Sequence, residues 1–192
     1  MKPTEAITYI SIATIVVSLF FIGTELTGFA TTNDTGVVNV TVGSTAIITF
    51  TTDFLNFGTG AVNSTLGTIM DSEGTVVNGT WPQVTGELVL QNDGNMNVSL
   101  GLQTDKSAAD FIGGTSGQTF EAKVTEDETG ACITPGVFTS YYAINTTNQL
   151  ACETFNWDDD ADQVRIDFNM TIPSNAENGE KTIEIKAVGS YN

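Results

Sequence analysis

The sequence contains no histidine. Histidine is the commonest general base in enzymes and a common ligand of transition metals. Its absence excludes Ser-His-Asp and Cys-His catalysis within this chain and disfavours a typical zinc site. Carboxylate catalysis needs a cleft that holds two carboxylates, and no pattern in the sequence indicates one. We therefore expect that the protein is not an enzyme and that it needs no cofactor.

Positive charge is also scarce, because six Lys and Arg residues stand against 23 Asp and Glu residues. The formal net charge is −17, and the pI is about 4.1. Such a field repels nucleic acid and anionic lipid, so we expect no nucleic-acid partner. The negative charge is compatible with a solvated acidic surface, with binding of divalent cations or with a high-salt environment outside the cell.

Cysteine occurs only twice, at Cys132 and Cys152. In a chain that looks exported, this spacing predicts one disulfide, and the alternative is a pair of buried free thiols. Closing a loop of this length would stabilise the fold by about 3 kcal/mol in the chain-entropy model.

The N-terminal region carries an uncharged apolar run from Ala6 to Gly23. As a helix, these 18 residues would span about 27 Å, just enough to cross the hydrocarbon core of a membrane. Pro3 and Glu5 suit the first helical turn, where a missing N–H is harmless and a negative charge is favourable. The sequence therefore predicts a hydrophobic N-terminal helix over residues 1–30.

One face of this predicted helix carries small hydroxyl residues, and Ile, Val, Leu and Phe surround the rest. Small residues let helices approach closely, and a helix that is apolar all round needs neighbours on every side. We expect these neighbours to be identical helices; the alternative is a lone membrane anchor whose Ser and Thr side chains bond to their own backbone. The residues predicted to mediate polymerisation are Glu5, Ile7, Ile10, Ser11, Thr14, Val17, Ser18 and Phe21.

From Val37 onward the pattern changes to short β-branched or alternating runs, separated by Gly- and Asn-rich turns. This pattern predicts an antiparallel β-sandwich head domain, broadly immunoglobulin-like, over residues 31–192. Together with the helix, it predicts an α+β chain. The turn Asn92-Asp93-Gly94-Asn95 is predicted to be hairpin-like. The predicted strands are Val37–Val42, Ala46–Thr52, Glu87–Leu90, Val98–Leu102, Phe120–Val124, Val164–Ile172 and Thr182–Val188. The aromatic residues expected in the core are Phe54, Phe57, Trp81 and Trp157.

Asn-X-Ser/Thr sequons are frequent: seven occur, and none has Pro in the middle. Their spread along the chain favours several glycosylated positions on the surface of a secreted protein. The glycosylation candidates are Asn33, Asn39, Asn63, Asn78, Asn97, Asn145 and Asn169.

Acidic residues cluster in two further places. Asp158, Asp160 and Asp162 follow Trp157, and Glu126-Asp127-Glu128 precedes the first cysteine. Oxygen ligands this dense could bind Ca²⁺, although no helix–loop–helix calcium pattern is present. Asp158, Asp160 and Asp162 are therefore weak candidates for a structural Ca²⁺ site, and plain solvated loops are the alternative.

The stretch from Met1 to Leu19, with Glu5 ahead of the apolar run and a β-domain directly after it, resembles the type IV filament superfamily. This superfamily includes type IV pilins and the archaeal pilins and archaellins. The resemblance implies that the N-terminal helices pack as a filament core and that the head domains form a glycosylated sheath. It also implies that the Glu5 carboxylate neutralises the N-terminal amine of a neighbouring subunit, whereas a simple helix-start acid is the alternative.

We therefore expect a structural subunit of an extracellular cell-surface filament, either an archaeal type IV pilus or an archaellum, that serves adhesion or motility. Its partners would be copies of itself, the membrane before assembly, and N-linked glycans. One alternative is a filament held by donor-strand exchange, with residues near 1–20 extended. The other is a membrane-anchored, glycosylated surface or binding domain.

Overall fold

The computed structural model describes residues 40–191. The chain divides into two units, Met1–Val42 and Gly43–Asn192. Of the first unit, only Val40–Val42 are described; they are exposed and belong to no strand, unlike the prediction for Val37–Val42. The predicted helix over residues 1–30, its polymerisation residues, the domain boundary at residue 30 and the sequons at Asn33 and Asn39 lie outside the described residues.

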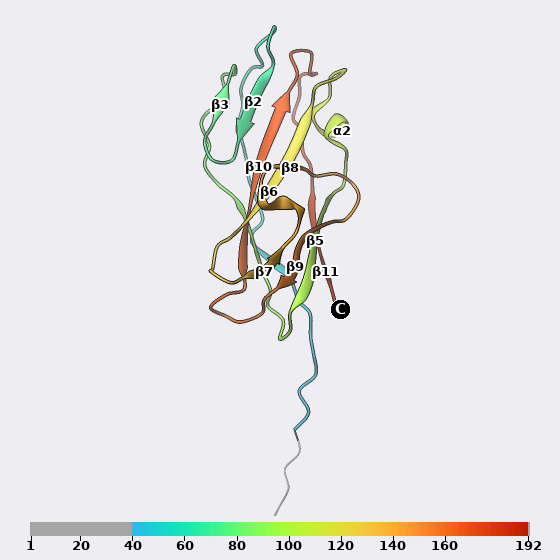
Figure 1. Cartoon of the computed structure of the whole chain (residues 1–192). Helices are drawn as coiled ribbons and strands as arrows, with labels where there is room; N and C mark the ends of the chain where they lie inside the picture. The colour runs from blue at the N-terminus through green and yellow to red at the C-terminus, as the bar shows by residue number, and fades with distance from the viewer. Residues whose placement is uncertain (1–39, 192) are drawn as a thin grey trace, which may run out of the picture. The chain divides into compact units, whose positions relative to one another are not determined.

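The prediction of an α+β chain with a long helix is wrong. Within residues 40–191, the α-helical structure is the five-residue helix α2 (Ala108–Ile112), and a short 3₁₀ turn, η1, covers Val137–Thr139. The rest of the regular structure is β-strand, arranged in two antiparallel sheets (Figure 1). Within residues 40–191, the physical reason is that β-branched runs, broken every few residues by Gly or Asn turns, leave no stretch long enough for a cooperative helix. The coarser prediction of a β-sheet-rich fold is confirmed.

The larger sheet has seven strands organised around β10. Along one side, β10 pairs with β6 from Val164↔Glu126 to Thr171↔Thr119. Along the other side, its first half pairs with β4 and its second half with β2. The strands β1, β3 and β8 extend this sheet beyond β4, β2 and β6. The seven strands are β1 (Thr49–Thr52), β2 (Thr68–Asp71), β3 (Val76–Val77), β4 (Leu88–Gln91), β6 (Thr119–Glu126), β8 (Tyr142–Ala143) and β10 (Gln163–Ile172).

The smaller sheet has four strands in the order β11-β5-β9-β7. They are β5 (Val98–Thr104), β7 (Cys132–Pro135), β9 (Gln149–Phe155) and β11 (Ile185–Ser190). Since β4 belongs to the larger sheet and β5 to the smaller one, the turn that starts at Asn92 carries the chain from one sheet to the other. The prediction of a hairpin-like turn at this position is therefore wrong.

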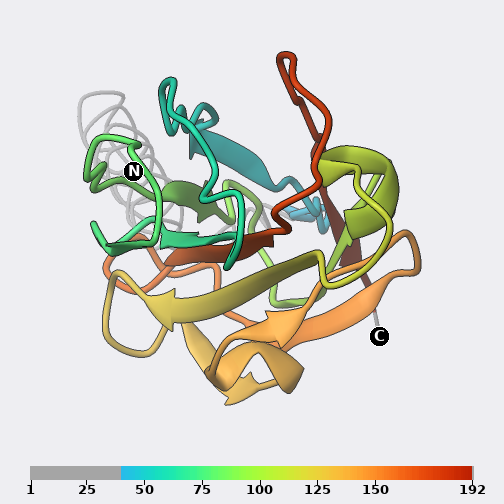
Figure 2. The ribbon, with the colours of Figure 1, turned by 90° about the horizontal axis from the view of Figure 1, so that it is seen from above.

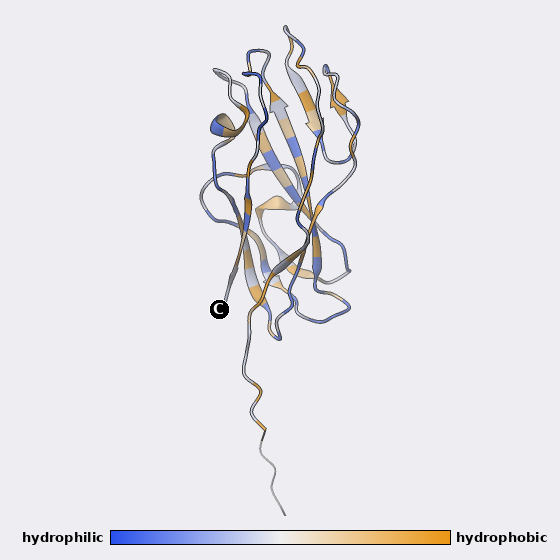
Figure 3. Cartoon of the chain, turned by 180° about the vertical axis from the view of Figure 1, so that it is seen from behind, coloured by the Kyte–Doolittle hydropathy of each residue, from blue (hydrophilic) through white to orange (hydrophobic). Residues whose placement is uncertain are grey.

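Both sheets contribute residues to one hydrophobic core. Figure 2 shows the backbone of the β unit from above. Along β10, the residues Val164, Ile166, Phe168 and Met170 are buried, and the intervening positions are mostly polar, the alternation that Figure 3 shows in colour. Period-two alternation puts one face of a strand into the core, and each large buried side chain contributes about 1.5–3 kcal/mol. Leu100 in β5 and other fully buried residues of the smaller sheet complete this core.

The short helix α2 closes one end of the core. Ser107 caps it, because its hydroxyl accepts a hydrogen bond from the Asp110 N–H at 3.1 Å and donates one to the Asp110 carboxylate at 2.6 Å. Phe111 packs edge-on against Phe120 with a centroid distance of 5.2 Å. Gly113, with φ of 78°, ends the helix in a conformation that favours glycine.

Candidate functional site

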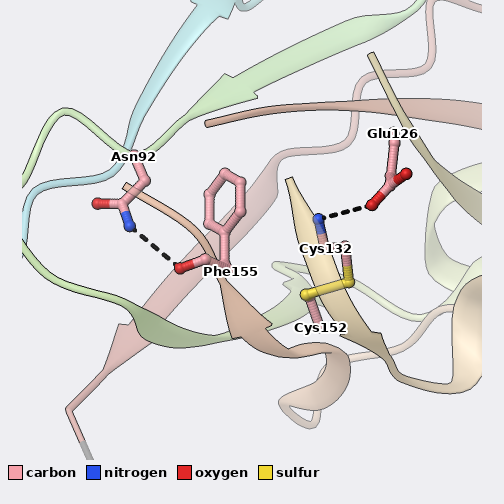
Figure 4. The surroundings of a disulfide bond; sticks show 5 residues. All are labelled: Asn92, Glu126, Cys132, Cys152 and Phe155. Atoms are coloured by element: carbon pink, nitrogen blue, oxygen red, sulfur yellow. Dashed lines mark hydrogen bonds between the residues drawn. A yellow bond between two sulfur atoms is a disulfide. The ribbon is translucent and has the colours of Figure 1, made fainter. Parts of the chain in front are cut away.

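The predicted disulfide between Cys132 and Cys152 is confirmed (Figure 4). It joins β7 to the neighbouring strand β9, with a Cα–Cα distance of 5.7 Å. Cys152 is fully buried and Cys132 almost so. The bridge therefore fixes the edge strand of the smaller sheet from within the core.

A buried amide lies at the same end of the domain. Asn92, at the crossing between the sheets, is only 1% exposed. Its Nδ2 donates to the backbone oxygens of Met96 at 3.0 Å and Phe155 at 3.3 Å, and its Oδ1 accepts from the Gly94 N–H at 3.2 Å. Figure 4 shows the Asn92 amide pointing at the Phe155 carbonyl. The Asn92 side chain thus supplies hydrogen-bond partners to backbone groups, such as the Met96 carbonyl, that have none in a β-sheet where the chain crosses between the sheets.

Three loops meet at this end, which we call the disulfide end: residues 92–97, 126–131 and 156–162. Hydrogen bonds hold them together, since the Asn92 N–H donates to the Asp162 carbonyl at 3.0 Å and the Asn156 N–H donates to the Ala131 carbonyl at 2.8 Å. The Cys132 N–H donates to the Glu126 carboxylate at 3.0 Å. Backbone and side-chain bonds thus connect each loop to a neighbour.

The segment that leads into β1 is attached to the disulfide end. The Thr45 N–H donates to Asn95 Oδ1 at 2.7 Å, and the Asn95 N–H donates to the Thr45 carbonyl at 3.0 Å. Asn95 Nδ2 also donates to the Gly43 carbonyl at 2.8 Å. Asn95 therefore fixes the first residues of the second unit.

The three weak calcium candidates occupy different environments. Asp158 and Asp160 are exposed, whereas Asp162 is 1% exposed. Within residues 40–191, no three acidic or Cys side chains are gathered in a way that could hold a metal ion. Glu128 does lie beside Asp162, because its Oε2 accepts from the Asp162 N–H at 2.9 Å. Burial first, and then the charge and hydrogen bond of Glu128, raise the pKa of the Asp162 carboxyl.

The described sequons lie at or near the surface. Asn63, Asn78, Asn97 and Asn145 are exposed, and Asn169 is half-buried in the central strand β10. The Oδ1 atom of Asn145 accepts hydrogen bonds from the N–H and hydroxyl of Thr147 within the same sequon. Glycosylation at these positions stays a prediction.

A polar cluster on the outer face of the larger sheet was not predicted. Lys123 Nζ lies 2.6 Å from Glu73 Oε1 and 3.7 Å from Asp167 Oδ2, and 4.9 Å above the ring of Tyr141. The Tyr141 hydroxyl donates to Glu73 at 3.0 Å. Hydrogen bonds from Lys123 and Tyr141 lower the pKa of Glu73, while burial and the Glu73 carboxylate raise the pKa of Tyr141. The only signal in the sequence is an outward-facing Lys in a strand.

A hollow of about 400 Å³ opens beside the disulfide, between β6 and β7. Its lining is mainly apolar, with Val124, Pro135 and Phe138 around two Thr hydroxyls and Glu126. Such a lining can shelter an apolar group but offers little for acid–base chemistry.

In the part of the chain that the structure describes, no helix is long and apolar enough to cross a membrane. No protein-family model, no curated protein and no solved structure matches the chain. The resemblance to type IV filament proteins therefore rests on the sequence pattern alone.

Proposed function

We propose that this chain is a structural subunit of an extracellular cell-surface filament, with adhesion or motility as its use. One feature carries the proposal: an uncharged apolar run over residues 6–23 precedes a separate, disulfide-linked β unit that begins at Gly43. An apolar run of this length needs lipid or protein around it, and copies of the same chain can provide that. The disulfide and the exposed sequons are consistent with an oxidising, extracellular location.

The proposal is tested on material sheared from cells that produce the chain. Electron microscopy should show long filaments, and mass spectrometry should identify the chain in them. The variant Ile10→Asp, in the middle of the apolar run, should abolish the filaments, because a buried charge in a packed apolar region is costly. Asp159→Asn, in an exposed loop, is the matched control and should leave them intact. Detergent-dependent monomers without any polymer would contradict the proposal and favour a membrane-anchored surface domain.

One observation favours a second mode of assembly, in which subunits are held together by strand exchange. Val40 and Val42 alternate with Thr41, and the two valines are 79% and 77% exposed. Extended, β-branched segments of this kind can add to the edge of another subunit's sheet. The double variant Val40→Asp/Val42→Asp separates the two modes. It should abolish filaments held by strand exchange and leave filaments held by the apolar run.

A further inference from the structure

Asp162 is a buried carboxylate with one uncompensated oxygen. Its Oδ2 accepts a hydrogen bond from Gln91 Nε2 at 3.1 Å, but its Oδ1 is buried and has no hydrogen-bond partner. The whole residue is 1% exposed, so bulk water does not solvate this oxygen. Leaving a charged oxygen buried and unpaired is costly, and an ion or a proton is the usual compensation.

The charges around Asp162 are negative. The Glu128 carboxylate lies beside it, held by the Asp162 N–H at 2.9 Å, and both Glu128 and Asp159 act on its pKa as like charges. Arg165, in the adjoining strand β10, instead lies 3.9 Å from Asp127. A cation at this position would therefore meet two carboxylates, and one of them has an unpaired, buried oxygen.

We propose that Asp162 and Glu128 bind one Ca²⁺ ion, which joins the loops 126–131 and 156–162 at the disulfide end. The ion would compensate Asp162 Oδ1 and remove the repulsion between the two carboxylates. Because no third acidic or Cys side chain is gathered with them among residues 40–191, backbone carbonyls and water complete the six to eight oxygen ligands that Ca²⁺ takes. Ca²⁺ accepts such mixed and flexible sets, whereas Mg²⁺ demands a near-ideal octahedron.

The affinity should be that of an extracellular module. Two carboxylates are a small charge count, which corresponds to a dissociation constant of about 10⁻⁴–10⁻³ M. At about 10 mM Ca²⁺, binding to the folded state alone should raise the Tm by about 3–10 °C. This inference does not depend on filament formation.

The experiment measures thermal unfolding of the full chain at pH 7, first with chelator and then with CaCl₂, MgCl₂ or NaCl at equal ionic strength. We expect Ca²⁺ to raise the Tm of the wild type more than Mg²⁺ or Na⁺ does. Asp162→Asn should remove most of this shift. Asp160→Asn is the matched control, because it removes the same charge from an exposed position in the same loop and should keep the shift. Glu128→Gln gives an independent test if Asp162→Asn folds poorly.

Two results would overturn the proposal. An equal Ca²⁺ shift in the wild type and in both site variants would mean diffuse screening of the acidic surface. No Ca²⁺ shift, together with stabilisation on acidification that Asp162→Asn abolishes, would mean that a shared proton compensates the pair. Stabilisation on acidification is expected because the pKa of Asp162 is raised in the folded state. The folded state then binds the proton more tightly than the unfolded state does, and this contribution to stability is lost as the pH rises.

Discussion

Asn92→Ala tests the role of the buried amide at the crossing between the sheets. The substitution removes two donated hydrogen bonds, to Met96 and Phe155, and one accepted bond from Gly94. The Phe155 residue is fully buried, so solvent cannot easily replace the bond to its carbonyl. The loss of three hydrogen bonds at a buried position should cost about 2–4 kcal/mol of unfolding free energy.

Urea unfolding measures this loss directly, and thermal unfolding should show a fall in Tm of about 4–16 °C for a domain of this size. Asn178→Ala is the matched control, because Asn178 is exposed in the loop between β10 and β11 and should change stability by less than about 0.5 kcal/mol. If Asn92→Ala were as stable as this control with an unchanged m-value, the reasoning about buried backbone partners would be refuted.

Two further predictions follow from the disulfide and from the polar cluster. Replacing both Cys132 and Cys152 by Ala should lower the unfolding free energy by about 3 kcal/mol, because the unfolded chain is no longer constrained by a closed loop of 20 residues. Calorimetry with and without reductant measures this loss. A change in Tm below about 2 °C would contradict the prediction. Lys123→Met should raise the pKa of Glu73, because it removes the hydrogen bond that lowers that pKa most. Carboxyl NMR titration should show this rise in the Glu73 pKa for Lys123→Met, and it should show no rise for the exposed control Lys186→Met. Because its pKa is lowered, Glu73 adds a small stability above its unfolded pKa that is lost as the pH falls, and this contribution should become smaller without Lys123.

The strands with regular alternation were predictable. The predicted strands Val98–Leu102, Phe120–Val124 and Val164–Ile172 correspond to β5, β6 and β10 with small differences in their ends. The first two of these strands follow turns with Gly or Asn, and in β6 and β10 apolar residues alternate with polar ones, which is the pattern typical of half-buried strands. Alternating or apolar runs thus identified these three strands.

The central strand β9 was missed because its buried residues do not alternate. Ala151 and Cys152 are both buried, while Leu150 is 41% exposed. The pairing of β9 with β5 and with β7 shifts register, as β-bulges do. A bulge adds a residue and shifts the inward-facing position by one, so the period of two that reveals a strand in the sequence is lost.

Aromatic content was a poor guide to the core in the loops. Phe54 is 74% exposed and Trp157 is 46% exposed, although both were expected inside. Large apolar residues are common on protein surfaces, and no alternating pattern surrounds these two. The exposure of Phe54 and Trp157 could not be predicted without the positions of the neighbouring loops.

The polar contacts were not predictable because they join residues far apart in the chain. Lys123 and Glu73 are 50 positions apart, and Tyr141 and Glu73 are 68 apart. Likewise, Asp162 was one acid among several in the sequence, and only the fold shows that it is buried beside Glu128. The local sequence pattern around a residue does not indicate which distant residue it will contact.

Two of the buried polar residues, Asn92 and Asp162, lie at the disulfide end for a physical reason. At a crossing between sheets, backbone groups leave the ladder that would satisfy them, so side chains must take over. The Asn92 side chain does this for the Met96 carbonyl, and the Asn95 side chain does it for the segment leading into β1. The same end holds Asp162 with its unpaired oxygen. The core-facing sides of the sheets rely on apolar burial, whereas the disulfide end relies on specific polar partners. An added ion should therefore change the disulfide end most.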